Sequence, residues 1–128
     1  MTLLIIGGVL AFAMGPSLFS IDIIGHTPPV AGDGMDVIWT TTVTNTGSKD
    51  IADLKLLANF GFMDFEATTP LPVDAMGSGL VGFGPLKAGD SLKIDSKLSA
   101  KQTGNANGYI TVVDAREPCT IHLKTAIR

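Results

Sequence analysis

MDVIWTTTVT, residues 35–44, is the run of sequence that decides the fold. It is rich in β-branched and aromatic residues, which favour strands over helices. Val37, Trp39, Thr41 and Val43 occupy alternate positions and therefore share one face of the expected strand. We predict that this face lies between two sheets, and that the single tryptophan fills space in the core instead of forming a ligand site.

Further strands are expected on both sides of this run. Turn signals rich in glycine, proline or asparagine separate them at residues 26–29, 31–34, 45–48, 85–90 and 104–108. The expected strands between those turns cover residues 17–23, 51–60, 91–98, 109–113 and 120–127. About six or seven short strands, spaced by roughly eight to twelve residues, predict an antiparallel immunoglobulin-like β-sandwich.

The charge balance and the cysteine count exclude several classes of function. Nine basic and twelve acidic residues give the chain of 128 residues a net charge of −3, which does not suit a nucleic-acid partner. One cysteine, Cys119, excludes a disulfide within the chain. We expect neither a nucleic acid nor a small-molecule substrate as a partner.

The N-terminal segment differs from the rest of the chain. Residues 1–21, MTLLIIGGVLAFAMGPSLFSI, contain no charged side chain; the first charge is Asp22 and the first basic residue is Lys49. Such an apolar segment has to be buried in a bilayer, in a partner subunit or in a core. We therefore expect a mainly β chain with one N-terminal helix. Residues 1–20 would form an apolar helical stem, which serves as assembly stem or membrane anchor, and residues 21–128 the β-sandwich head.

The spacing of small residues favours packing between stems. As a helix, residues 2–24 would be roughly 34 Å long, about one hydrocarbon core. Gly7, Ala11 and Gly15 would then form one small face that allows close helix approach, although Pro16 should kink or end the helix. A bundle of stems is favoured over a lone anchor. The expected assembly residues are the following apolar and small ones: Leu3, Leu4, Ile6, Gly7, Leu10, Ala11, Phe12 and Gly15.

The same segment has some features of a signal peptide. Ala11-Phe12-Ala13 fits the small-x-small cleavage pattern, but no Lys or Arg precedes the apolar run. We expect instead that a basic leader was removed ahead of Met1, which would leave the stem at a new N-terminus.

Histidine and aspartate residues give little sign of a metal site. His26 and His122 are too far apart in sequence for a zinc motif, and His122 sits in an alternating strand. Asp22, Asp33 and Asp36 lie near one turn but lack the regular oxygen spacing of a calcium loop. Turn chemistry explains the Asp-Gly pair better, so we expect no bound metal.

No catalytic or cofactor motif is found either. Cys119 has no obvious base partner, and a lone thiol in a strand usually acts as a small apolar residue. The glycines of residues 77–84 lack the strand-then-helix context of a dinucleotide loop, and Ser78 lacks a nucleophile elbow. We therefore expect a protein that is not an enzyme and has no cofactor.

Three runs of sequence resemble a known family. These are VIWTTTVTNTGS at 37–48, IADLKL at 51–56 and PLKAGDSL at 85–92. They resemble small immunoglobulin-like surface domains in which a strand–N-T-G–strand pattern precedes a P-L-x-x-G-[DE] turn. Together with the uncharged N-terminus, they resemble an archaeal-type type IV pilin across most of the chain. Ile5, where bacterial type IV pilins carry glutamate, and the lack of a C-terminal cysteine pair differ from the bacterial pattern.

The resemblance implies a structural subunit of an extracellular cell-surface filament. Identical subunits would form a helical polymer with stems in the core and heads outside, after a membrane-inserted stage before assembly. Two alternatives remain open. One is a membrane-anchored envelope or motor-accessory module, and the other is a donor-strand filament in which the N-terminus inserts into the next sandwich.

Overall fold

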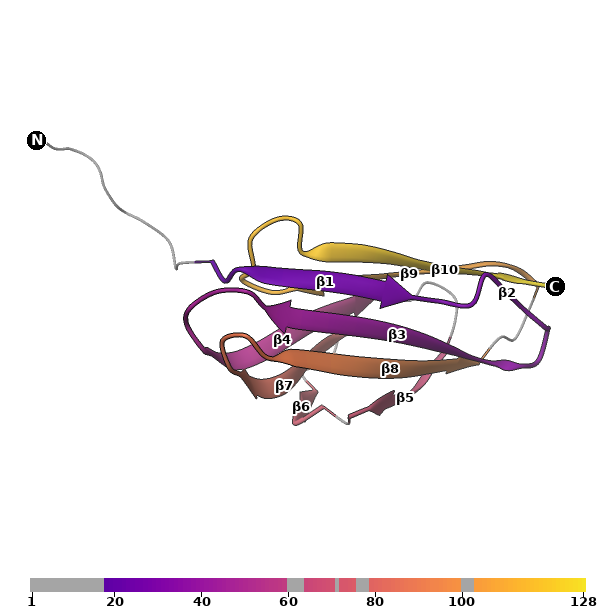
Figure 1. Cartoon of the computed structure of the whole chain (residues 1–128). Coiled ribbons are helices and arrows are strands. Elements are labelled where there is room, and N and C mark those ends of the chain that lie inside the picture. Colours follow the sequence, from indigo (N-terminus) through magenta and orange to yellow (C-terminus); the bar gives the residue numbers. More distant parts are fainter. Residues whose placement is uncertain (1–17, 60–63, 71, 76–78, 100–102) are drawn as a thin grey trace, which may run out of the picture.

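The computed structural model describes residues 18–59, 64–70, 72–75, 79–99 and 103–128, and these residues form strands arranged in two sheets (Figure 1). The strands are β1 (Ile21–His26), β2 (Val30–Ala31), β3 (Asp36–Asn45), β4 (Ile51–Asn59), β5 (Asp64–Thr69), β6 (Asp74–Ala75), β7 (Leu80–Leu86), β8 (Ser91–Ser99), β9 (Gly104–Val112) and β10 (Thr120–Ile127).

The two sheets pack face to face as a β-sandwich. One sheet has four strands in the order β1-β3-β8-β5, and the other has six in the order β2-β10-β9-β4-β7-β6. Neighbouring strands are antiparallel apart from β2, which pairs with β10 in parallel. The expected immunoglobulin-like β-sandwich is therefore confirmed as the architecture of the head.

The expected fold class, mainly β with one N-terminal helix, is wrong for the part of the chain that the structure describes, which holds strands and no helix. Of the expected helical stem, residues 1–20, the described residues 18–20 form no helix, and Phe19 makes a parallel bridge with Ala115. The strand expected at 17–23 overlaps β1, whose residues 21–24 pair with residues 42–45 of β3. The physical reason is alternation: Ile21 and Ile23 are partly buried whereas Asp22 and Ile24 are exposed, as a half-buried strand requires. Residues 1–17 of the expected stem lie outside the described residues.

The core is centred on Trp39, as predicted from the alternation of its strand. Val37, Trp39, Thr41 and Val43 are each no more than 1% exposed. Trp39 lies on β3, and its Nε1–H donates a hydrogen bond of 2.9 Å to Oγ1 of Thr125 on β10, in the opposite sheet. The predicted core position of Trp39 is confirmed, and its polar atom is satisfied across the sandwich.

Both sheets contribute apolar side chains to this core. Those from the six-stranded sheet include Leu54, Ile110 and Leu123, each at most 2% exposed. Gly25 allows β1 to approach that sheet closely, because a Cβ at this position would lie 2.5 Å from Cδ2 of Leu123 and 2.8 Å from Cδ1 of Ile121. Because Gly25 has no side chain, β1 can pack directly against Leu123 and Ile121 at this edge of the sandwich.

Two of the expected turns are corrected by the structure. Residues 104–108 were expected to turn, but they belong to β9, which pairs with β10 from Gly104 to Thr111. Long-range pairing overrides the local turn preference of Asn and Gly, because Ala106, Gly108, Ile110 and Val112 are all buried at alternate positions. Pro85 and Leu86, expected in a turn, end β7, so that turn is limited to residues 87–90.

Replacing Trp39 with alanine is expected to lower the free energy of unfolding by ~3–5 kcal/mol, because it leaves a large cavity and orphans a hydrogen bond. Urea denaturation measures this loss. Ile38→Ala is the matched control, since Ile38 is 47% exposed on the same strand, and it should change stability by only about 0.5 kcal/mol. The wild-type emission should be blue-shifted and weakly quenched by iodide. A solvent-like spectrum with Trp39→Ala as stable as the control would contradict the placement.

Candidate functional site

The turn after β3 is organised by the buried side chain of Asn45. Its Nδ2 group donates to the carbonyl oxygens of Lys49 at 2.8 Å and of Leu86 at 3.1 Å. Its Oδ1 accepts the backbone N–H of Gly47 at 3.1 Å. Because Asn45 is only 1% exposed, these bonds replace the water that its amide would otherwise bind. The N-T-G pattern of the sequence thus ties the turn to the end of β7.

The chain enters the sandwich immediately beside this turn. The N–H of Phe19 donates to the carbonyl of Asp114 at 2.8 Å, and the N–H of Arg116 donates to the carbonyl of Phe19 at 2.9 Å. Phe19 thereby forms a parallel bridge with Ala115, in the connection between β9 and β10. The carbonyl of Ser20 accepts the N–H of Thr46 at 3.1 Å. Backbone hydrogen bonds on both sides therefore hold residues 18–20, here called the entry strand because they lead into β1, in place.

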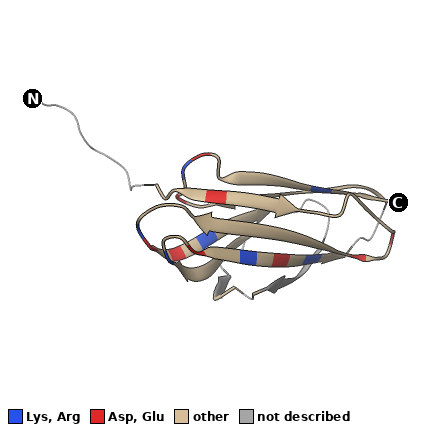
Figure 2. Cartoon of the chain, in the orientation of Figure 1, with Lys and Arg blue, Asp and Glu red and all other residues tan. Residues whose placement is uncertain are grey.

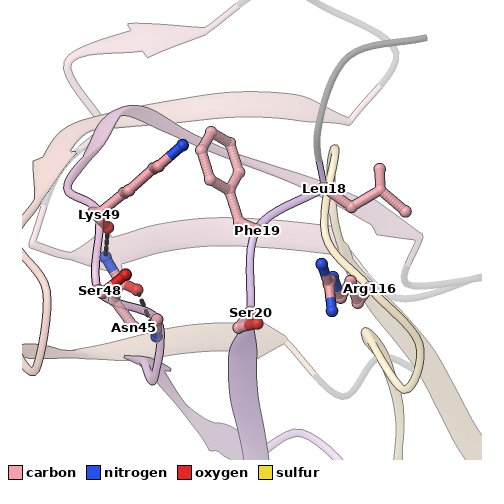
Figure 3. Close-up of a pocket in the computed structure, with 8 residues that line it drawn as sticks. Leu18, Phe19, Ser20, Asn45, Ser48, Lys49 and Arg116 are labelled. Carbon is pink, nitrogen blue, oxygen red and sulfur yellow. Dashed lines mark hydrogen bonds between the residues drawn. The ribbon is translucent and has the colours of Figure 1, made fainter. Parts of the chain in front are cut away.

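A half-open cavity of about 260 Å³ lies at this entry point (Figure 3). The side chains of Lys49 and Arg116 lie on either side of the Phe19–Ser20 backbone. The lining residues come from the entry strand, the turn after β3 and the β9–β10 connection: Leu18, Phe19, Ser20, Asn45, Gly47, Ser48, Lys49 and Arg116. Two cations and two serine hydroxyls thus share a cavity with apolar groups.

The electrostatics of the cavity favour an anion. Within the described residues, the ion pairs are Lys55–Asp53 at 3.5 Å and Lys97–Asp36 at 3.2 Å, so neither cation of the cavity takes part in one. The lining residues include no carboxylate. Figure 2 shows acidic residues in loops of the sandwich. Asp50, the residue after Lys49, accepts the N–H of Ala88 at 2.9 Å. The cavity can therefore hold a hydrogen-bond acceptor with negative charge.

The expected assembly residues lie outside the described residues. This applies to the complete set: Leu3, Leu4, Ile6, Gly7, Leu10, Ala11, Phe12 and Gly15. The structure shows where the chain leaves the segment that holds them, namely at Leu18, in the wall of the cavity.

The histidines and aspartates considered for metal binding are dispersed. His26 ends β1, whereas His122 on β10 stacks on Tyr109 with ring centroids 4.6 Å apart. A ring nitrogen, Nε2, of His122 also lies 2.8 Å from Oδ1 of Asn107. Asp36 pairs with Lys97 on β8. No three His, Cys, Asp or Glu side chains gather to form a metal site among the residues that the structure describes.

Cys119 is buried, and its thiol donates a hydrogen bond to Oε1 of Glu117. This hydrogen bond, followed by burial, raises the pKa of the Cys119 thiol, so the thiol is protonated at neutral pH and is a poor nucleophile.

The glycine-spaced segment lies only partly within the described residues. Gly79, immediately before β7, has a φ of 80°. Gly77 and Ser78 lie outside the described residues.

The cavity itself was not predicted from the sequence. Phe19 and Ser20 fall in both the expected stem, 1–20, and the expected strand, 17–23, and Lys49 and Arg116 lie far apart along the chain. The expected strand at 17–23 rests on this run, because Phe19, Ile21 and Ile23 alternate along the entry and β1. Only the topology, which places the β9–β10 connection beside the turn after β3, brings the two cations to one site.

Replacing Asn45 with aspartate is expected to lower the free energy of unfolding of the head by about 1–3 kcal/mol. The substitution removes both N–H donors and places a carboxylate against the carbonyls of Lys49 and Leu86. Thermal unfolding followed by circular dichroism measures the effect. Asn105→Asp makes the same chemical change at an exposed position of β9 and should change stability little. Equal melting temperatures for the two variants would contradict the role assigned to Asn45.

Comparisons with known proteins identify the fold and no family. No family model matches the sequence, and no curated protein matches it. The solution structure of a CARDB domain from Pyrococcus furiosus has a TM-score of 0.62 at 11% identity, covering 84% of this chain and 93% of that chain. A crystal structure of that domain in complex with di-metal ions has a TM-score of 0.62 at 12% identity, covering 89% and 97%.

A third similar structure is the ASH or PapD-like domain of human CEP192. Its TM-score is 0.51 at 12% identity, and the alignment covers 98% of this chain and 96% of that chain. At such identities, similarity shows the fold alone. The chain thus has an immunoglobulin-like or PapD-like β-sandwich fold.

Proposed function

We propose that the chain is a structural subunit, not an enzyme, of an extracellular cell-surface filament of the archaeal pilus type. In this proposal the uncharged N-terminal segments pack together inside the filament and the β-sandwich heads lie outside. The observation that carries it is an uncharged run, residues 1–21, that leads directly into an anchored entry strand of the sandwich.

The composition of the segment supports assembly by burial. At about 25 cal/mol per Å² of buried apolar surface, each buried leucine or isoleucine contributes ~1.5–3 kcal/mol. Leu3, Leu4, Ile6, Leu10 and Phe12 could together contribute on the order of 10 kcal/mol per subunit. A contribution of this size is comparable with the ~4–15 kcal/mol that association itself costs.

The attachment at Phe19 supports a regular arrangement of heads. Phe19 makes two backbone hydrogen bonds to the β9–β10 connection, and the adjacent Ser20 makes one to the turn after β3. The entry strand lies at one end of the sandwich and the C-terminus at the opposite end (Figure 1). A head held in this way keeps a fixed direction relative to the point where the N-terminal segment joins it. Helical symmetry requires such a fixed direction.

The alternatives use the same segment differently. Among the described residues no helix is long and apolar enough to cross a membrane. A membrane-anchored monomer would need the segment only as an anchor.

A donor-strand filament would need a head that is incomplete without its neighbour. Here, however, the core side chains of β3, β4, β8, β9 and β10 are covered by strands of the same chain. We therefore favour assembly through the N-terminal segment, with a membrane-inserted stage before it.

Replacing Leu10 with lysine should abolish filament formation, because a charge buried without a partner costs far more than one contact contributes. Negative-stain electron microscopy of the purified full chain measures this. Val73→Lys is the matched control, since Val73 is 73% exposed on the head, and it should leave filaments intact.

Two results would count against this proposal. Detergent-dependent monomers of the wild-type chain, with no filaments under any condition, would favour the anchored module. Filaments of equal yield from Leu10→Lys and Val73→Lys would show that the uncharged segment is not what holds the subunits together.

A further inference from the structure

We propose that the cavity beside Phe19, with Lys49 and Arg116 on its two sides, binds the phosphate of an anionic lipid headgroup. This inference rests on the membrane-inserted stage of the proposed function. It adds a defined site on the head that would set how deep the chain sits before assembly.

The order of residues along the chain matches the order of layers in a bilayer. Leu18, the first described residue of the uncharged run, is 49% exposed and forms part of the cavity wall. The cations of the cavity follow immediately in space, on both sides of the entry strand (Figure 3). An apolar segment in hydrocarbon would therefore bring Lys49 and Arg116 to the level of the phosphates.

The groups in the cavity fit a phosphate chemically. A guanidinium provides paired N–H donors for phosphate oxygens, and an ammonium adds a second positive charge. The hydroxyls of Ser20 and Ser48 line the same cavity and can donate further hydrogen bonds. A volume of about 260 Å³ leaves room for water around the bound group.

Acidic neighbours keep their charge but form no ion pair with Lys49 or Arg116 within the described residues. Asp50 accepts the N–H of Ala88, and Glu117 accepts the thiol of Cys119. Asp114 contributes its backbone carbonyl to Phe19 and is not among the residues that line the cavity. Lys49 and Arg116 are both exposed, so a lipid phosphate can reach them.

The test measures how the full chain partitions between vesicles. Detergent-purified chain is mixed at low salt with vesicles of phosphatidylcholine, or of phosphatidylcholine with phosphatidylglycerol, and bound chain is separated by flotation. Two cations near the surface should favour the anionic vesicles by roughly tenfold or more. The double variant Lys49→Gln/Arg116→Gln should lose most of this preference. Lys93→Gln/Lys124→Gln removes equal charge from exposed strand positions and should keep it.

Circular dichroism and Trp39 emission confirm that both variants are folded. A preference kept by Lys49→Gln/Arg116→Gln, or lost equally in both variants, overturns the lipid site and leaves the filament proposal standing. If Lys49→Gln/Arg116→Gln partitions between vesicles like the wild type but forms fewer filaments, the cavity binds a carboxylate of a second subunit. That result also overturns the lipid site. A wild-type chain that binds neither vesicle overturns both this inference and the membrane stage.

Discussion

The buried indole N–H of Trp39 has to find a hydrogen-bond partner inside the core, and its partner ties the two sheets together. Thr125 Oγ1 accepts this bond on β10 and donates its own hydrogen to the carbonyl of Pro28 at 2.6 Å. One chain of hydrogen bonds thus links β3, β10 and the segment between β1 and β2. Around it the apolar faces of both sheets close, because any shift of register would orphan these polar groups.

Beside this core, two loops at the end where the chain enters the sandwich hold the incoming chain. At the end where the chain enters, Asn45 orders one loop and Phe19 is bonded to another, so the entry strand has little freedom. Among the described residues, the buried side chains of both sheets form one core, and Phe19 at the entry packs against it. The proposed assembly uses the apolar segment that precedes this entry.

How much could be predicted from the sequence depended on whether a local pattern decided the structure. The strand around Trp39 and its buried face were predicted correctly, because strict alternation leaves one solution. The turn expected at 104–108 was wrong, because pairing with β10 overrode local preference. The helix expected over residues 1–20 is not seen at the described residues 18–20, where Phe19 pairs with Ala115. The cavity between Lys49 and Arg116 could not be predicted, since two loops distant in sequence form it.

The measurement that most directly tests this account is the unfolding of residues 18–128 alone, followed in parallel by Trp39 fluorescence and far-ultraviolet circular dichroism in urea. If the sandwich completes its own core, this fragment should be monomeric and the two signals should change in one cooperative, coincident transition. A fragment that aggregates, or whose tryptophan is exposed to solvent before the strands unfold, would show that residues 1–17 are part of the core and would contradict the account.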